Sequence, residues 1–262
     1  MQIPRGVRAI LSTTFRYFHI SFIEAKARYG GSRLGILWIP LSALLFSLVL
    51  SLIFRHSDNT TNIEYFLYVY SGYILWLFIS ESINGSTDII QGKLEFSLHN
   101  NMTLEGLFAK LLVDKILVYL INFGVLSVII AFIDWQRIGG AYLLILPFLM
   151  IISISGFCVS YMINIATIHV PDLKPMVRIG TRFLFFSSPV FWTAAAGGGG
   201  DVRDFLVQYN PVSHYLNIQR YIIGGGQGLL VSFIVVMLVT LFLIGGSAVL
   251  YLATNAYVRN LK

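Results

Sequence analysis

Charged residues are scarce in this sequence. Asp, Glu, Lys and Arg make up 11% of its 262 residues, whereas 56% are hydrophobic. A soluble domain carries roughly 25% charged residues, so this chain has too little polar surface to cover itself in water. A soluble globular domain is excluded, and an all-α membrane protein is predicted. Because no polar stretch is long enough to fold separately, residues 1–262 are expected to form a single transmembrane domain.

Cysteine and the familiar catalytic motifs are also rare or missing. Cys158 is the single cysteine, so no disulfide can form within the chain. The five histidines share no metal-ligand spacing, and no G-x-S-x-G or similar motif is present. The stretch from Gly85 to Leu94 looks like a phosphate-binding loop, but its glycines are too far apart and Leu94 replaces the required Ser or Thr. We therefore expect no enzyme here, with no catalytic residue, no metal and no cofactor in this chain.

Carboxylates are missing from the middle of every expected membrane span. Glu64, Glu81, Asp114 and Asp134 all lie at span boundaries. A carrier coupled to protons or sodium ions normally places such groups at mid-membrane, so that class is disfavoured. The energy for any transport is then expected to come from an accessory ATPase.

The sequence is rich in long apolar segments. The segment Leu34–Phe54 has no ionisable side chain, and its length is about the 20 residues that a helix needs to cross hydrocarbon. A buried core helix is the alternative, but the recurrence of such segments argues against it. The six expected spans are Leu34–Phe54, Tyr65–Ser82, Leu107–Ile133, Tyr142–Ile168, Met176–Trp192 and Leu229–Thr254. Spans one to five thus occupy residues 34–192, and span six with its basic tail occupies 229–262.

The remaining segments are too polar or too short to cross. Residues 1–33 have an amphipathic pattern, with a basic face that includes Arg8 and Arg16 beside an apolar face that includes Phe15 and Phe22. This pattern is typical of a helix that lies flat in the membrane interface, and packing on other protein is the alternative. Residues 193–228 are expected to form an external segment with short re-entrant or gate helices. Its run 194–200 is of unusually low complexity, and no role is assigned to it.

The distribution of basic residues predicts the orientation. If both termini are cytoplasmic, only Arg55, Arg137, Arg203 and Arg220 of the 18 Lys and Arg lie on the opposite face. The net charge of +6 is explained by this bias, so nucleic acid is not an expected partner. A multi-pass protein with both termini in the cytoplasm is predicted.

A few polar side chains fall within or near the expected spans. Lys115, near the start of the third span, is expected to reach towards the interface with its ammonium group. Asn122 and Asn164 are expected to bond neighbouring helices rather than a substrate.

Aromatic residues gather in the second and fifth spans. The candidate channel-lining residues are Tyr70, Tyr73, Trp76, Phe183 and Phe186. Flat rings pack on sugar faces while their polar edges bond sugar hydroxyls. The alternative is an interfacial aromatic belt with lipid-facing packing. Both interpretations are kept.

Three sequence pieces resemble a known family in their order and spacing. The first is Ala27-Arg28-Tyr29, Ser32-Arg33-Leu34-Gly35 and Leu37-Trp38 at the first span. The second is Ser187-Ser188-Pro189-Val190-Phe191 after His169-Val170-Pro171-Asp172, and the third is Asn210-Pro211 followed by Arg220. Together they resemble the permease subunits of polysaccharide-exporting ATP-binding-cassette transporters, of the O-antigen exporter type, over essentially the whole chain.

The resemblance implies a function and a set of partners. The chain would be the membrane-spanning channel subunit of an ATP-driven exporter in the bacterial cytoplasmic (inner) membrane. Its substrate would be polysaccharide, most readily O-antigen, carried on a polyprenyl-pyrophosphate lipid. Two copies would form the pore, and two separate nucleotide-binding ATPase subunits would bind ATP and Mg. Capsule or teichoic acid permeases are the alternative within this type, and a membrane-embedded glycan-processing enzyme is the alternative from another class.

Site residues follow from the same resemblance as hypotheses. Lys26, Arg28 and Arg33 stand where the lipid pyrophosphate would enter, and arginine suits bidentate contact with phosphate. Plain positive-inside topology explains the same residues as an alternative. The polar stretch 84–101, with Lys93, Glu95 and His99, and the N-terminal amphipathic helix are expected to meet the ATPases.

Overall fold

The computed structural model of the chain describes residues 5–54, 61–99, 103–192, 200–225 and 228–260, and these residues are helical with short connections. The helices are α1 (Arg5–Arg28), α2 (Trp38–Phe54), α3 (Asn62–Asn84), α4 (Ile89–His99), α5 (Leu104–Ile133), α6 (Ile145–His169), α7 (Leu173–Ser187), α8 (Gly200–Tyr209), α9 (Pro211–Ile222) and α10 (Leu229–Asn260). Short 3-10 turns lie at Gly35–Leu37, Trp135–Arg137 and Gly140–Leu144. The described residues contain no strand, which confirms the predicted all-α class.

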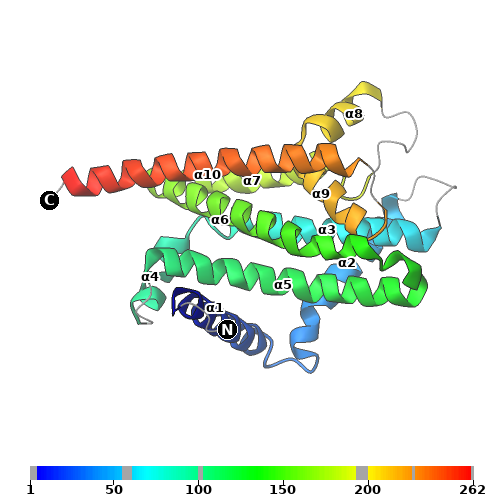
Figure 1. Cartoon of the computed structure of the whole chain (residues 1–262), viewed down its shortest axis with the longest axis horizontal. Helices are drawn as coiled ribbons and strands as arrows, with labels where there is room; N and C mark the ends of the chain where they lie inside the picture. The colour runs from blue at the N-terminus through cyan, green and yellow to red at the C-terminus, as the bar shows by residue number, and fades with distance from the viewer. Residues whose placement is uncertain (1–4, 55–60, 100–102, 193–199, 226–227, 261–262) are drawn as a thin grey trace.

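Five helical stretches in the described part of the chain are long and apolar enough to cross a membrane. They are Gly35–Phe54, Asn62–Asn84, Leu104–Ile133, Gly140–His169 and Leu229–Thr254. These stretches match the first, second, third, fourth and sixth expected spans. Helix α6 lies between α10 and α5 and packs against both (Figure 1). The multi-pass architecture is thus confirmed, while the count of six stays a prediction.

The expected fifth span is shorter than predicted. Helix α7 has 15 residues, which is about 22 Å of helix against a hydrocarbon core of about 30 Å. The helix ends at Ser187, although the apolar sequence continues to Trp192. Ser188 is extended, with φ −96° and ψ 142°, because the ring of Pro189 disfavours the helical conformation in the residue before it. The prediction of one continuous helix through Trp192 is wrong for this reason.

Local signals fix several helix starts. Thr61 and Glu64 form a capping box at the start of α3, in which each side chain bonds the other's backbone N–H. Thr103 caps α5 by accepting from the Gly106 N–H. Asn210 caps α9, and Pro211 follows at the first helical position, where a missing N–H costs nothing.

Helix α3 is the centre of the bundle. It lies against α2, α5, α6, α7 and α9, and its Val69, Tyr70 and Leu75 side chains are completely buried. Helix α10 is the opposite case, because it exposes large apolar side chains such as Leu238 and Phe242. Such a surface suits lipid rather than water.

Helix α1 lies across the bundle and rests on α5 (Figure 1). Glu24 on its packed side forms an ion pair with Lys110 of α5. Phe15 and Phe22, from the predicted apolar face, remain exposed. This arrangement agrees with the expected amphipathic helix.

Different short helices lie at the two ends of the bundle. Helix α4 and the C-terminal end of α10 lie at one end, which we name the α4 end (Figure 1). Helices α8 and α9 lie at the opposite end, which we name the α9 end (Figure 1). Two short helices therefore do occupy the segment between α7 and α10. The low-complexity run lies almost wholly in 193–199, outside the described residues.

Candidate functional site

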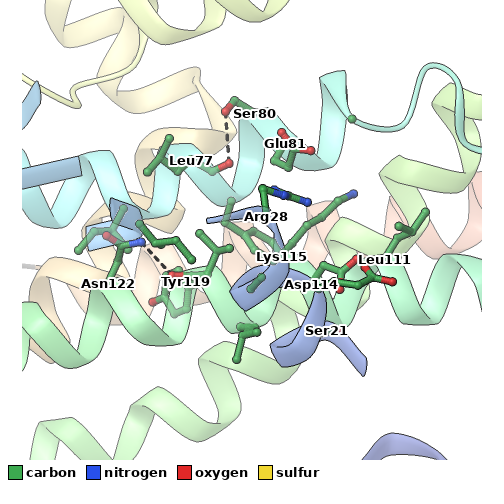
Figure 2. A pocket seen from close by; sticks show the side chains of 18 of the residues that line it. Ser21, Arg28, Leu77, Ser80, Glu81, Leu111, Asp114, Lys115, Tyr119 and Asn122 are labelled. Carbon is green, nitrogen blue, oxygen red and sulfur yellow. Dashed lines mark hydrogen bonds between the residues drawn. The ribbon is translucent and has the colours of Figure 1, made fainter. Parts of the chain in front are cut away.

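A cavity of about 330 Å³ opens between α1, α3, α4 and α5. We name it the charged cavity, because six charged side chains line it: Glu24, Arg28, Glu81, Lys93, Asp114 and Lys115. Figure 2 shows Arg28, Glu81, Asp114 and Lys115 together around this space. Three of these residues are acidic and three are basic, so the cavity suits a polar ligand with a charged group.

Lys110 fixes one wall of the charged cavity. Its side chain is 1% exposed, and its ammonium group pairs with Glu24 of α1 and, at 2.9 Å, with Asp114 of its own helix. A buried cation needs such partners, because an unpaired charge inside a protein is strongly destabilising. The lysine therefore attaches α1 to α5.

Arg28 and Lys93 meet at this cavity, although the sequence placed them in two different roles. Arg28 also lines a neighbouring hollow of about 390 Å³ with Tyr29, Ser32 and Trp38. Desolvation lowers the pKa of Lys93 from its ordinary value, and the nearby charge of Lys110 adds to this effect. Of the predicted pyrophosphate residues, all of which the structure describes, Arg28 lines these two cavities.

The other residues of those two sets lie apart from the charged cavity. Lys26 and Arg33 are exposed and do not line it. Glu95 and His99 are exposed on α4, where the His99 Nδ1 atom lies 3.1 Å from the Glu95 carbonyl oxygen. Their exposure leaves both available to a partner protein.

Lys115 does not reach towards the interface, so that expectation is wrong. It is 7% exposed, and its ammonium group donates to the Ser160 Oγ atom at 3.0 Å and to Ser86 Oγ at 3.4 Å. These hydroxyls satisfy the buried ammonium group inside the bundle.

The Asn164 side chain bonds a different part of the chain, as predicted: it donates to the Ser86 carbonyl oxygen, just after α3, at 3.0 Å. Asn122 instead donates to Val118 of its own helix, so the predicted bond between helices is wrong for that side chain.

A second hollow, of about 440 Å³, lies between α2, α3 and α7. We name it the aromatic groove, and its rings are those of Phe46, Tyr73, Trp76, Phe185 and Phe186. The Phe46 and Tyr73 ring centres are 4.6 Å apart, and those of Trp76 and Phe185 are 5.2 Å apart. Arg178 and Arg182 of α7 line the same groove. Rings beside guanidinium groups suit sugars and anionic groups.

Three of the five predicted channel residues line this groove: Tyr73, Trp76 and Phe186. Tyr70 does not, because it is completely buried, its ring stacks on Phe66 and its hydroxyl donates to the Asn122 carbonyl oxygen at 3.4 Å. The packing of α3 therefore places Tyr70 in the core of this chain and outside the groove, and its channel-lining role stays a prediction. Phe183 is 71% exposed on α7 and lies outside the groove.

At the α9 end, Arg220 joins three elements. It is 7% exposed, and its Nη2 atom donates to the carbonyl oxygens of Pro189 at 2.6 Å and Val190 at 3.3 Å. Its guanidinium lies 3.5 Å from the centre of the Tyr68 ring. The Tyr68 hydroxyl in turn donates to the Trp192 carbonyl oxygen at 2.9 Å. We name these residues the Arg220 cluster; it holds the segment after α7 against α3 and α9.

Sequence reasoning missed Lys110 and the structural role of Arg220. Lys110 and Asp114 have the i, i+4 spacing of a helical ion pair, which is a usable signal. Glu24 lies 86 residues from Lys110, and nothing in the sequence connects them. Arg220 was identified from topology and from its place after Asn210-Pro211, but its partners are backbone carbonyls, which leave no residue pattern.

Two proteins with assigned names are similar to this chain. No family model matches the chain. It is 23% identical over 193 residues to the "O-antigen export system permease protein RfbA" of Myxococcus xanthus, covering 72% of each protein. It is also 23% identical over 201 residues to the protein of the same name from Klebsiella pneumoniae, covering 72% of this chain and 73% of that one. The resemblance that the sequence motifs suggested is therefore borne out.

Proposed function

We propose that this chain is the membrane-spanning subunit of an ATP-driven exporter that moves lipid-linked polysaccharide, of the O-antigen class, across the bacterial inner membrane. The observation that carries the proposal is its similarity to two O-antigen export permeases over 72% of its length. Five apolar helices of sufficient length support the same function.

The assembly that we propose has two copies of this chain and two separate ATPase subunits that bind ATP and Mg. The α4 end would be cytoplasmic, with both chain termini on that side, as the positive-inside rule favours. Helix α4, with Lys93, Glu95 and His99, and helix α1 would then meet the ATPases. Helix α7 and the segment after it would make the fifth of six crossings, and α8 and α9 would form the external gate.

Two hollows suit the two parts of a lipid-linked glycan. The aromatic groove offers rings to sugar faces, and Arg178 and Arg182 offer charge to anionic groups. The charged cavity presents Arg28 at the C-terminal end of α1, where a pyrophosphate group could be bound by a bidentate arginine. In this proposal the charged cavity receives the lipid headgroup, and the groove, facing a second copy, guides the sugar chain.

The decisive experiment is reconstitution. The chain is purified with its proposed ATPase partner, placed in proteoliposomes and supplied with lipid-linked O-antigen. We expect glycan to cross only when ATP is hydrolysed, and we expect a partner ATPase with its phosphate-loop lysine replaced to abolish transfer. Native mass spectrometry of the same sample tests for two chains and two ATPases.

Two outcomes would contradict the proposal. Directional transport by the chain alone would show that it carries its own energy source. Cleavage or joining of sugars by the chain alone would favour the glycan-processing enzyme instead.

A further inference from the structure

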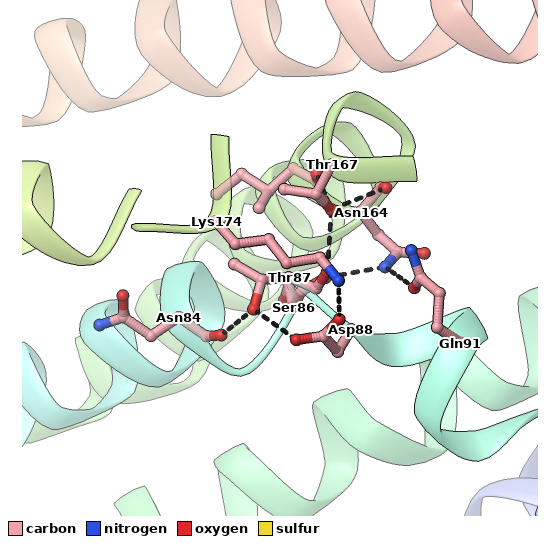
Figure 3. A network of polar contacts seen from close by, with 9 residues as sticks. Asn84, Ser86, Thr87, Asp88, Gln91, Asn164, Thr167 and Lys174 are labelled. Atoms are coloured by element: carbon pink, nitrogen blue, oxygen red, sulfur yellow. Dashed lines mark hydrogen bonds and ion pairs between the residues drawn. The ribbon is translucent and has the colours of Figure 1, made fainter. Parts of the chain in front are cut away.

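The turn between α3 and α4 is bound by side chains from α6 and α7. The Asn164 side chain donates to the Ser86 carbonyl oxygen at 3.0 Å, and the Thr167 hydroxyl donates to the Thr87 carbonyl oxygen at 2.9 Å. Figure 3 shows these contacts with the Lys174 ammonium group directed at Asp88. The backbone of this turn is therefore fixed by hydrogen bonds that originate in other helices, and α4 begins immediately after it.

The ion pair between Lys174 and Asp88 joins the starts of two helices. Asp88 immediately precedes α4, where a carboxylate is favourable because it faces the positive end of the helix dipole. Lys174 is the second residue of α7. The Asp88 side chain is 47% exposed and that of Lys174 is 30% exposed, so this ion pair contributes little to stability. A role in fixing how α4 and α7 sit relative to each other explains the pair better than a role in folding.

The far end of α7 is held as well. The segment after Ser187 is bound by the Arg220 cluster through the carbonyl oxygens of Pro189 and Val190. The Thr181 hydroxyl, midway along α7, donates to the Asn84 Oδ1 atom at 3.2 Å. Helix α7 is therefore attached to the α4 turn at one end and to α9 at the other. A hydrogen-bonded helix of this length is a stiff element, so a displacement at one end reaches the other.

We propose that Lys174 is a positioning residue which, through Asp88, makes α7 follow α4. A displacement of α4 then passes along α7 to residues 188–192 and from there to α9. This inference rests on the proposed function, because the ATPase subunits are what would move α4. It adds a residue, Lys174, that lies outside the predicted set Lys93, Glu95 and His99, and a route to the α9 end.

The test uses charge reversal in the complex reconstituted with its ATPase. The variants are Lys174→Glu, Asp88→Lys, and the two together, which restore an ion pair of opposite sense. Export and ATP hydrolysis are measured in the same vesicles. We expect each single variant to retain hydrolysis but to export at least about fivefold less glycan per ATP, the lower range of typical coupling between sites. The double variant is expected to recover most of the loss.

Three controls separate coupling from folding. Lys174→Arg keeps the charge and should export normally. Asp172→Asn removes the charge of an exposed carboxylate that precedes α7 and makes no side-chain capping hydrogen bond, and it should also export normally. The melting temperature of each purified variant should stay close to that of the unaltered chain, because the pair is partly exposed.

Each result decides the inference. Wild-type export per ATP in both single variants overturns it and leaves the proposed function intact. Loss of assembly or a lower melting temperature in the single variants, without recovery in the double variant, overturns it in favour of a structural role. If the unaltered complex shows no ATP-dependent export, the proposed function fails, and this inference falls with it.

Discussion

The guanidinium of Arg220 lies 3.5 Å from the centre of the Tyr68 ring, inside the bundle. The same arginine donates to two carbonyl oxygens in the segment after α7, at Pro189 and Val190. Those carbonyls are free to accept because Pro189 ends the helix and turns the chain. One side chain from α9 therefore fixes a segment that lies beyond the end of α7.

Replacing Arg220 should destabilise the protein. In Arg220→Lys the charge stays, but a point-like ammonium group does not reproduce a planar guanidinium stacked on a ring and bonded to two carbonyls. We expect a loss of about 2 kcal/mol in the free energy of unfolding, since hydrogen bonds to a charged group contribute about 1.5–3 kcal/mol. Thermal unfolding of the detergent-purified chain measures this loss.

Tyr68→Phe is the matched control for that prediction. It keeps the ring beneath the guanidinium and removes only the hydroxyl, so the loss should be about 1 kcal/mol. If Arg220→Lys unfolds at the same temperature as the unaltered chain, the Arg220 cluster does not stabilise this end of the bundle.

Gly72 makes the close approach between α3 and the segment after α7 possible. A Cβ atom at this position would lie 2.9 Å from both the Arg220 Nη2 atom and the Val190 carbonyl oxygen. Because one of these contacts is backbone, the segment must shift to accommodate it. We expect Gly72→Ala to cost about 1–3 kcal/mol of stability, as overpacking in a core does.

Gly124→Ala supplies the comparison in the same assay. A Cβ atom there meets nothing within 4 Å, and alanine is the better helix former. Gly124→Ala should therefore unfold at the same or a higher temperature. Equal effects of the two substitutions would contradict the close approach at Gly72.

Sequence reasoning located most of the membrane-competent helices but not how they face one another. Apolar length is a local property, so spans such as Leu34–Phe54 could be identified directly. Pro189 was a visible signal that α7 would end early, but the apolar run to Trp192 outweighed it. Helix α3 is apolar on all sides, so no pattern could show that Tyr73 and Trp76 line a groove while Tyr70 lies in the core.

The candidate site was also predicted only in part, because its contacts join segments that are far apart in the sequence. Arg28 and Lys93 were each put forward as candidates from the family resemblance, but their meeting at one cavity depends on how α1 crosses α5. The pairs Glu24–Lys110 and Asp88–Lys174 are each separated by 86 residues. A single sequence carries no signal for contacts at such separation.

Lys110 should hold α1 on the bundle. In Lys110→Met the two carboxylates of Glu24 and Asp114 lose their shared cation and repel each other. Both carboxylates are partly exposed, so we expect a loss of about 2 kcal/mol rather than the 3–5 kcal/mol typical of a fully buried pair. The direct measurement is limited trypsin digestion, in which cleavage after Lys26 and Arg28 should become faster.

A double substitution distinguishes charge repulsion from loss of packing. Lys110→Met with Glu24→Gln removes one of the opposing carboxylates, and the digestion rate should return towards that of the unaltered chain. An unchanged rate in Lys110→Met alone would mean that α1 is held by other contacts.

The aromatic groove gives the sharpest test of the substrate path. Trp76 packs on Phe185, and Tyr73 packs on Phe46, so alanine at either position removes a ring from the wall of the groove. If sugars stack on this wall, losing one aromatic surface should lower glycan-stimulated ATP hydrolysis and export by about fivefold, since such contacts contribute about 0.5–1.5 kcal/mol beyond buried area. The complex with Tyr73→Ala should still be recovered in normal yield, because Tyr73 is only half-buried, whereas Trp76→Ala also removes core packing, since Trp76 is 6% exposed. Phe132→Ala is the control, since that ring is 87% exposed on α5 and faces away from the protein.

Wild-type export in both Tyr73→Ala and Trp76→Ala would remove these rings from the substrate path and favour the interfacial aromatic belt. Reduced export in Phe132→Ala as well would point to a general effect of aromatic surface on insertion rather than to the groove.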